Sequence, residues 1–299
     1  MKLKATAALA VTVVLWASAF PAIKVGLDGY GVAGLSFARL AVASVILALV
    51  APLLGVRMPR RADLPLIAVC GLAGMSAYQL LLNWGEVHVP AGTASLLVSV
   101  APVFSVVLAA AFLGERLSAR KVLGSVVALA GSVLIAAGGG GLEYSGGAWV
   151  VLAAAAVQAV YHFCSKPLLK RYTGLEVACY VMWAGTLFLI PLAPQAIEAV
   201  GSATAGAGLA VVFLGALPSA AGFVAWGYAV ARQSIAVATA ALYLVPAIAL
   251  VVAFVWLGET PRPIDIVGGA VSICGVALIT LRGSVLRKRV GASLARIPT

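Results

Sequence analysis

The segment PVFSVVLAAAFLGERLSARKVLGSVVALAGSVLIA at residues 102–136 is repeated 144 positions later as PAIALVVAFVWLGETPRPIDIVGGAVSICGVALIT at residues 246–280. Eleven of the 35 aligned positions are identical. They include the first proline, a Leu-Gly-Glu triplet and two glycines, which a chain rich in Ala, Val and Leu would not align by chance. A duplicated hydrophobic unit is the construction principle of secondary transporters. The repeat therefore predicts a transporter.

The composition indicates a membrane protein. Hydrophobic residues make up 63% of the chain and charged residues 10%, and the mean hydropathy is +1.12, which lies outside the range of soluble domains. Runs near the roughly 20 residues that cross a bilayer predict an all-α integral membrane fold of ten transmembrane helices, because the runs are continuously apolar rather than alternating. The predicted spans are 5–23, 33–54, 64–83, 91–113, 121–137, 148–169, 175–192, 209–231, 235–257 and 264–282.

The basic residues orient these spans. With a cytoplasmic N terminus, seventeen Lys and Arg residues lie on the cytoplasmic side, only Lys24 and Arg262 lie on the opposite side, and Arg39 lies inside the second span. This bias follows the positive-inside rule, so we expect a multi-pass protein of the bacterial inner membrane with both termini cytoplasmic. The net charge of +11 then reflects topology and not nucleic-acid binding.

A second alignment, at an offset of 142, pairs residues 16–24 with residues 158–166. The first span is therefore the counterpart of the sixth and is not expected to be a cleaved signal peptide. Each half holds five spans, and an odd number makes the second half enter the membrane from the opposite side. We predict two inverted-topology five-helix repeats, 1–143 and 144–299, joined by the glycine-rich stretch 138–147.

These features resemble the drug/metabolite transporter superfamily, in its EamA family, and within it the YddG-type amino-acid exporters. The residues that carry the resemblance are Trp16 to Lys24, Ala101-Pro102, Val245-Pro246 and the two Leu-Gly-Glu corners. The resemblance implies export of amino acids and similar metabolites by alternating access, through a cavity formed by helices one, three, four, six, eight and nine. The expected partners are a small-molecule substrate and the lipid bilayer, and the chain is expected to be a monomer, with a dimer as the alternative.

Polar side chains within the spans independently indicate a cavity. Gln158, Tyr161, His162 and Ser165 have the spacing of one helical face, which lipid cannot satisfy, although bonds between helices are the alternative to a cavity. An aromatic and weakly polar pocket suits neutral or zwitterionic solutes. The other candidate substrate-binding residues are Trp16, Phe20, Tyr78, Gln79, Asn83, Ser95, Ser99, Ser219, Phe223, Trp226, Thr239 and Tyr243.

Two prolines at equivalent positions, Pro102 and Pro246, fall near the middle of the fourth and ninth spans. Each removes a backbone donor and leaves the carbonyl four residues earlier, at Val98 or Leu242, without its bond. Fixed kinks are one interpretation, but their occurrence in both halves favours paired hinges. The glycine pairs of the repeat, Gly124 with Gly131 and Gly268 with Gly275, are expected to permit close helix packing and not to bind a ligand.

Missing residues narrow the function further. All nine acidic residues are expected in connections or at span ends, whereas ion-coupled carriers usually place a carboxylate within the membrane, so uncoupled efflux remains open. An intramembrane enzyme would need a motif such as His-Glu-x-x-His or Gly-x-Ser-x-Gly, and a sensor would not need an inverted repeat. The four scattered cysteines predict free thiols, with no metal and no cofactor. Export of another metabolite or a drug is the alternative to amino-acid export.

The predicted topology can be tested with reporter fusions along the chain. Both termini should be cytoplasmic, because the positive-inside bias sets the orientation. An external C terminus would contradict both the orientation and the inverted repeat. Fusions should report the cytoplasm after Arg60, Ser118 and Thr299, and the external side after Glu86, Glu143 and Val200.

Overall fold

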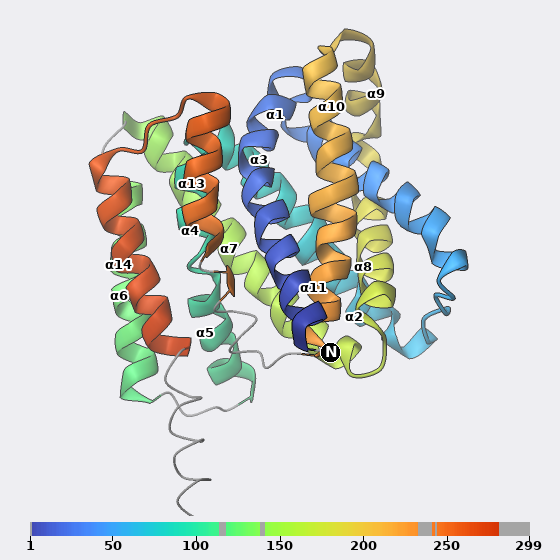
Figure 1. The fold of residues 1–299 in the computed structure, drawn as a ribbon, viewed down its shortest axis with the longest axis horizontal. Coiled ribbons are helices and arrows are strands. Elements are labelled where there is room, and N and C mark those ends of the chain that lie inside the picture. Colours follow the sequence, from blue (N-terminus) through green and yellow to red (C-terminus); the bar gives the residue numbers. More distant parts are fainter. Residues whose placement is uncertain (1, 114–117, 138–140, 233–240, 243, 281–299) are drawn as a thin grey trace, which may run out of the picture.

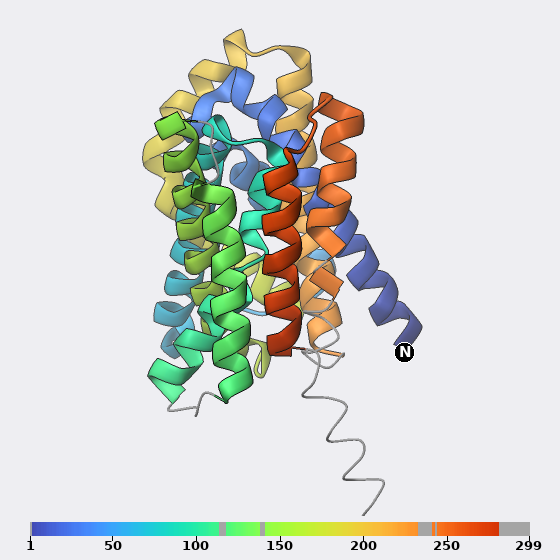
Figure 2. The ribbon, with the colours of Figure 1, turned by 90° about the vertical axis from the view of Figure 1, so that its left-hand side faces the viewer.

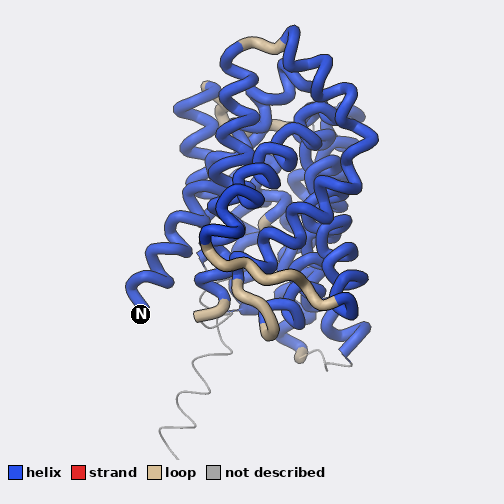
Figure 3. Tube along the Cα trace, turned by 90° about the vertical axis from the view of Figure 1, so that its right-hand side faces the viewer, coloured by secondary structure: helices blue, strands red, loops and turns tan. Residues whose placement is uncertain are grey.

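The structure, a computed structural model, describes residues 2–113, 118–137, 141–232, 241–242 and 244–280. These residues form helices and short connections, with no strand among them (Figure 3). The α-helices are α1 Lys2–Leu53, α2 Leu64–Cys70, α3 Tyr78–His88, α4 Ala91–Val98, α5 Ala101–Leu113, α6 Ala119–Ala137, α7 Gly141–Leu169, α8 Gly174–Leu189, α9 Ala193–Ser202, α10 Ala205–Leu214, α11 Gly222–Val230, α13 Leu244–Leu257 and α14 Pro263–Thr280.

Helix α1 contains the first two predicted spans. Its apolar run Leu3–Leu53 has 51 residues, about 77 Å at 1.5 Å per residue, which is more than twice the hydrocarbon thickness of a bilayer. Gly31 divides the run into two arms with φ 60° and ψ −179°, a conformation that is essentially restricted to glycine. With four further long runs and four shorter apolar helices, the described residues are consistent with ten spans. The exact count stays a prediction, because the ninth span is described only from residue 241.

Two π-helices interrupt the third and eighth spans. They are Gly71–Ala77, between α2 and α3, and Gly215–Ala221, between α10 and α11. Their positions differ by 144 residues, the offset of the sequence repeat, so the repeat extends to backbone geometry outside the segment that revealed it. Sequence analysis treated both spans as regular helices. Such π-helical turns are rare and occur frequently at functional sites.

Helices α6 and α14, which carry equivalent segments of the two repeats, pack side by side (Figures 1 and 2). A Cβ atom on Gly275 would lie 2.3 Å from the backbone nitrogen of Ala128, and one on Gly131 would lie 2.5 Å from the carbonyl oxygen of Gly268. The early part of each helix meets the late part of the other, so the two run antiparallel, as an inverted repeat requires. The prediction that these glycines permit close packing is confirmed.

The fourth predicted span is interrupted rather than continuous. Helix α4 ends at Val98 and α5 begins at Ala101, and the Val103 backbone nitrogen donates to the Val100 carbonyl at 2.8 Å. Pro102 therefore lies in the first turn of α5, where a missing backbone donor costs little. Pro246 is the third residue of α13, and residues 241 and 242 are helical as well. Whether either proline is a hinge stays a prediction.

Three predicted boundaries were wrong. Helix α3 continues to His88, so Glu86 and His88 lie on a helix and not in a connection; a charged side chain ended the predicted span too early. The linker predicted at 138–147 is helical from Gly141, because α7 begins there despite its glycines. Helix α9 was not predicted; its Glu198 and polar neighbours interrupted the apolar pattern, and it lies at the end of the bundle opposite the N terminus (Figure 1).

Candidate functional site

Five of the predicted site residues form an aromatic cluster: Trp16, Tyr161, His162, Phe223 and Trp226. They come from α1, α7 and α11. The ring of Trp16 lies 5.2 Å from that of Phe223 and 5.5 Å from that of Trp226, centroid to centroid. His162 approaches Trp226 at 6.1 Å, and Tyr161 approaches Phe223 at 5.9 Å. These separations are those of interacting aromatic pairs, so three helices converge on one cluster.

The polar stripe on α7 keeps buried atoms without partners. Oε1 of Gln158 and Nε2 of His162 are buried and form no hydrogen bond. Ser165 donates its hydroxyl to the His162 carbonyl at 3.3 Å and so satisfies itself within the helix. Buried polar groups are normally paired, and an exception marks strain, a missing water or a ligand position. The unpartnered atoms lie on the helix face that sequence analysis assigned to a cavity.

A buried arginine organises a second group, the arginine cluster, made of Arg39, Gln79 and Ser219. Nη1 of Arg39 donates to Oε1 of Gln79 at 2.8 Å. Nε and Nη2 donate to the Ser219 hydroxyl at 3.3 and 3.1 Å. Arg39 is only 3% exposed. Ser219 lies in one π-helix and Gln79 follows the other, so both irregular segments border this guanidinium.

Sequence analysis missed Arg39 as a functional residue. An arginine within an apolar span was the available signal, because charged residues inside membranes are rare and usually functional. The Arg39 guanidinium joins the second arm of α1 to Gln79 and to Ser219, both of which were predicted for other reasons.

The two clusters share one segment of chain. Nε1 of Trp16 donates to the carbonyl of Pro218 at 3.2 Å, and Ser219, the next residue, accepts from Arg39. A Cβ atom on Gly222 would lie 2.8 Å from Nε1 of Trp16, so the indole lies directly against this turn. The π-helix Gly215–Ala221 therefore connects the aromatic cluster with the arginine cluster.

Other predicted residues lie beside these clusters or apart from them. Asn83 donates to the Ser36 hydroxyl at 2.8 Å, and its Oδ1 is buried without a partner. Tyr78 is half-buried and packs on the hydrophobic core, of which Phe20 is a part. Neither Tyr78 nor Phe20 belongs to the aromatic cluster.

The candidates of the fourth and ninth spans contribute less. Ser95 and Ser99 donate to the carbonyls of Gly92 and Leu96, each at 2.6 Å, so their hydroxyls are satisfied by their own helix. Thr239 and Tyr243 lie outside the described residues.

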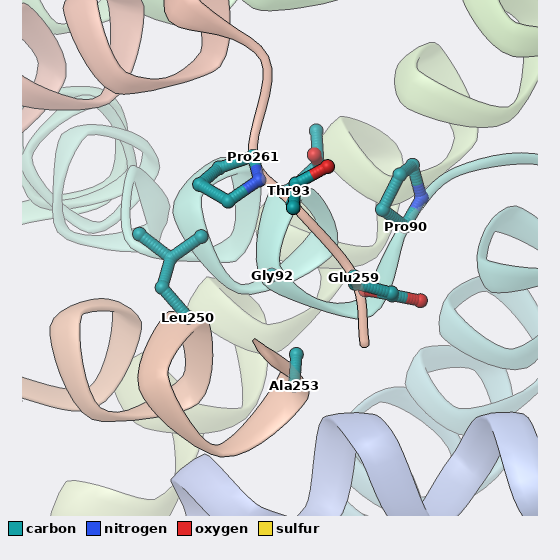
Figure 4. A pocket seen from close by; sticks show the side chains of 8 residues that line it. Pro90, Gly92, Thr93, Leu250, Ala253, Glu259 and Pro261 are labelled. Atoms are coloured by element: carbon teal, nitrogen blue, oxygen red, sulfur yellow. The ribbon is translucent and has the colours of Figure 1, made fainter. Parts of the chain in front are cut away.

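The acidic residues were expected in connections or at span ends, and Glu86 lies at a span end, two residues before α3 ends at His88. Glu86 is completely buried on α3, and both of its carboxylate oxygens lack hydrogen bonds. Lys24 donates to the Glu86 backbone carbonyl, and its charge attracts the carboxylate. Glu259, whose Oε2 is also buried and unpartnered, lines a small recess with Thr93 and Pro90 (Figure 4). Each repeat therefore has a glutamate with buried, unpartnered oxygen towards the end opposite the N terminus, Glu86 completely and Glu259 in part.

At the N-terminal end of the bundle, ion pairs join the two repeats. Nε of Arg57 lies 2.7 Å from Oε1 of Glu176, and this hydrogen bond raises the pKa of the Arg57 guanidinium. Asp63 pairs with Arg171 and accepts from the Tyr172 hydroxyl at 2.6 Å. Each acid is buried and faces a partner from the other half of the chain.

The opposite end carries one such network around the buried Asp265. Its carboxylate accepts from Arg262 at 2.7 and 3.0 Å, from the Tyr144 hydroxyl at 3.2 Å and from Thr93 at 3.1 Å. The bond to Asp265 raises the pKa of the Arg262 guanidinium. Because Thr93 belongs to the first repeat and Asp265 to the second, the two halves are also tied together here.

Comparison with known proteins identifies the repeated unit. A model of the EamA-like transporter family matches residues 3–137 and matches again at residues 145–281. The chain belongs to the EamA-like transporter family. This EamA protein is thus a membrane transporter built from an internal repeat, and the prediction that it is not an enzyme is confirmed.

Its relatives are exporters and transporters. A probable terminal-alkyne amino-acid exporter of Streptantibioticus cattleyicolor is 66% identical over 283 residues, covering 94% of this chain and 95% of that protein. An uncharacterized transporter of Bacillus subtilis is 38% identical over 92% of this chain and 90% of that one. A solved crystal structure has a TM-score of 0.63 at 21% identity, covers 95% of this EamA chain and 100% of its own, and shows the fold alone.

Two glutamines of the site should respond oppositely to the same substitution. Gln158→Leu removes a buried oxygen that has no partner, so the free energy of unfolding should hold or rise by about 1 kcal/mol. Gln79→Leu deprives Arg39 of an acceptor and should lower the free energy of unfolding by roughly 1.5–3 kcal/mol. Thermal unfolding of both variants in one detergent measures the difference. Equal destabilisation would show that the Gln158 oxygen has a protein partner after all.

Proposed function

We propose that this EamA transporter exports neutral amino acids with apolar side chains, aromatic ones included, across the bacterial inner membrane by alternating access. The observation that carries the proposal is the pair of buried, unpartnered polar atoms, on Gln158 and His162, beside the aromatic cluster. A bound solute would supply the missing hydrogen bonds, while the rings would surround its side chain.

The relative from Streptantibioticus supports the substrate class. Its name specifies an amino acid whose side chain ends in an alkyne, which is apolar and uncharged. Aromatic faces suit such a group because they offer large apolar contact without requiring hydrogen bonds. At 66% identity over nearly the whole chain, the same class is proposed here, with side chains that end in an alkyne among the substrates.

Alternating access requires that the two ends open in turn. Arg57–Glu176 and Asp63–Arg171 hold the repeats together at the N-terminal end, and Asp265 does so at the opposite end. In the proposed cycle one set breaks while the other persists. We retain Pro102 and Pro246 as the proposed hinges, because the interruption before Pro102 already separates α4 from α5.

The orientation and the coupling are also part of the proposal. Both termini are placed in the cytoplasm, so the end opposite the N terminus faces outward. The buried Glu86, near the end of its membrane-spanning run, is a titratable group that could couple flux to protons. Flux therefore has to be compared with and without an imposed pH gradient.

Purified protein in liposomes should carry labelled leucine, phenylalanine and a terminal-alkyne amino acid, and each should compete with the others. Protein-free liposomes and liposomes with Trp226→Ala protein are the controls. The variant should lose most of the flux, because it lacks the indole ring that packs against Trp16 and His162. Flux of a nucleotide sugar or a quaternary ammonium compound, without any amino-acid flux, would refute this substrate class.

The hinge proposal is tested by Pro102→Ala. Alanine restores a backbone donor, so α4 and α5 can join through a bond from residue 102 to the Val98 carbonyl. The melting temperature should hold or rise, while transport falls and the labelling of cysteines placed near the two ends shifts in favour of one end. Pro246→Ala should shift the labelling in the opposite sense, because the repeats are inverted. Wild-type transport with unchanged labelling in both variants would make the prolines fixed structural elements.

A further inference from the structure

We propose that Arg39 binds the carboxylate of the transported substrate, so that the arginine cluster is an anion site; this inference rests on the proposed function and deepens it. The site would hold the α-carboxylate of an amino acid, and the adjoining aromatic cluster would hold its side chain.

The first observation is a buried cation without an anion. Within the described part of the chain, no carboxylate lies at ion-pair distance from the Arg39 guanidinium. The guanidinium donates its hydrogen bonds to the neutral oxygens of Gln79 and Ser219. The field of Glu86 reaches it from farther away. A desolvated charge is costly unless it is paired, and charged residues within membranes usually pair with one another or mark a substrate path. A substrate carboxylate would provide the missing opposite charge.

The second observation concerns the remaining donors. A guanidinium has five N–H groups in one plane, and the bonds to Gln79 and Ser219 use one on Nε, one on Nη1 and one on Nη2. Each of the two terminal nitrogens therefore keeps one N–H. Each of these remaining N–H groups can donate to a carboxylate oxygen, and such charge-assisted bonds are among the strongest that arginine forms.

The third observation is position. Ser219 accepts from Arg39, and the preceding carbonyl, of Pro218, accepts from the indole of Trp16. A solute whose carboxylate meets Arg39 thus has its side chain next to the aromatic cluster. One turn from Gln79 along α3, the buried Oδ1 of Asn83 has no partner and is an acceptor suited to the substrate's ammonium group.

The fourth observation is that the charge is confined to one repeat. In the second span, Gly34-Leu35 and Ala38 match Gly174-Leu175 and Ala178 at an offset of 140, so the counterpart of Arg39 is Cys179. Cys179 is buried at the equivalent place in α8, where no charged side chain is needed. The duplicated scaffold therefore packs with an uncharged residue at this point. Because the fold does not require a charge here, we attribute the charge of Arg39 to ligand binding.

Comparing an amino acid with its primary amide isolates the carboxylate. Affinity is measured for purified protein by competition with labelled leucine, using leucine and leucinamide as competitors. Arg39→Gln should weaken leucine binding about 10-fold to 100-fold, the range of a hydrogen bond to a charged group, and leave leucinamide unchanged. Arg39→Lys should recover part of the loss. Arg232→Gln is the matched control, because Arg232 is exposed and stacks on Tyr228, and its ratio of leucine to leucinamide affinity should equal that of the wild type.

A second variant covers the case in which Arg39→Gln does not fold. Gln79→Glu places a carboxylate on the same guanidinium, so stability should hold or rise while leucine affinity falls and leucinamide affinity remains. An unchanged leucine-to-leucinamide ratio in either folded variant would make Arg39 a structural link between helices. Wild-type protein that carries no amino acid would refute the proposed function instead, and the inference with it.

Discussion

Every backbone amide inside a bilayer must find its hydrogen bond within the protein, and the architecture follows from that requirement. It explains why the described residues form helices almost throughout, and why departures from α-helix are informative. The π-helices Gly71–Ala77 and Gly215–Ala221 border the arginine cluster, and the interruption between α4 and α5 lies within the protein interior. Irregular backbone is tolerated at membrane depth only where protein or a polar cavity surrounds it, so these interruptions are expected to face the interior of the bundle.

Charged side chains at the two ends of the bundle differ in their bonding from those at its centre. Ion pairs with buried acids connect the two repeats at the N-terminal end, and a hydrogen bond from Thr93 to the buried Asp265 connects them at the opposite end. The centre holds a guanidinium bounded by neutral oxygens and aromatic rings. Each end is thus held by bonds whose partners are already in place. At the centre, Arg39 keeps unused donors and Gln158 an unused acceptor, and Glu86 keeps unpartnered carboxylate oxygens towards the end opposite the N terminus. The bonded groups hold the two halves together, whereas the unpartnered ones are not used for this.

The duplication, the helical class and most spans were predictable because the length of the apolar runs and the repeat at an offset of 144 residues are visible in the sequence. The residues of the aromatic cluster were predictable, because side chains spaced three or four residues apart lie on one face of a helix. The π-helices were not predictable, because the change in backbone hydrogen bonding leaves no trace in the amino-acid composition of the segment. Glu86 was placed in a connection because a charge usually ends an apolar run, and Lys24, which donates to its backbone carbonyl, is 62 residues away in the sequence. Arg39 and its two partners come from three different segments, and no spacing within a single sequence reveals that they meet.

The matching positions of the two π-helices also bear on the history of the gene. A π-helical turn holds more residues than the α-helical turn that it replaces, because its hydrogen bonds span one residue more. Two unrelated insertions would have no reason to fall at the same place in both halves, 144 residues apart. A single insertion in the ancestral half-length gene, made before that gene duplicated, accounts for both. The ancestral protein would then have presented this turn twice only by associating with an oppositely oriented copy of itself.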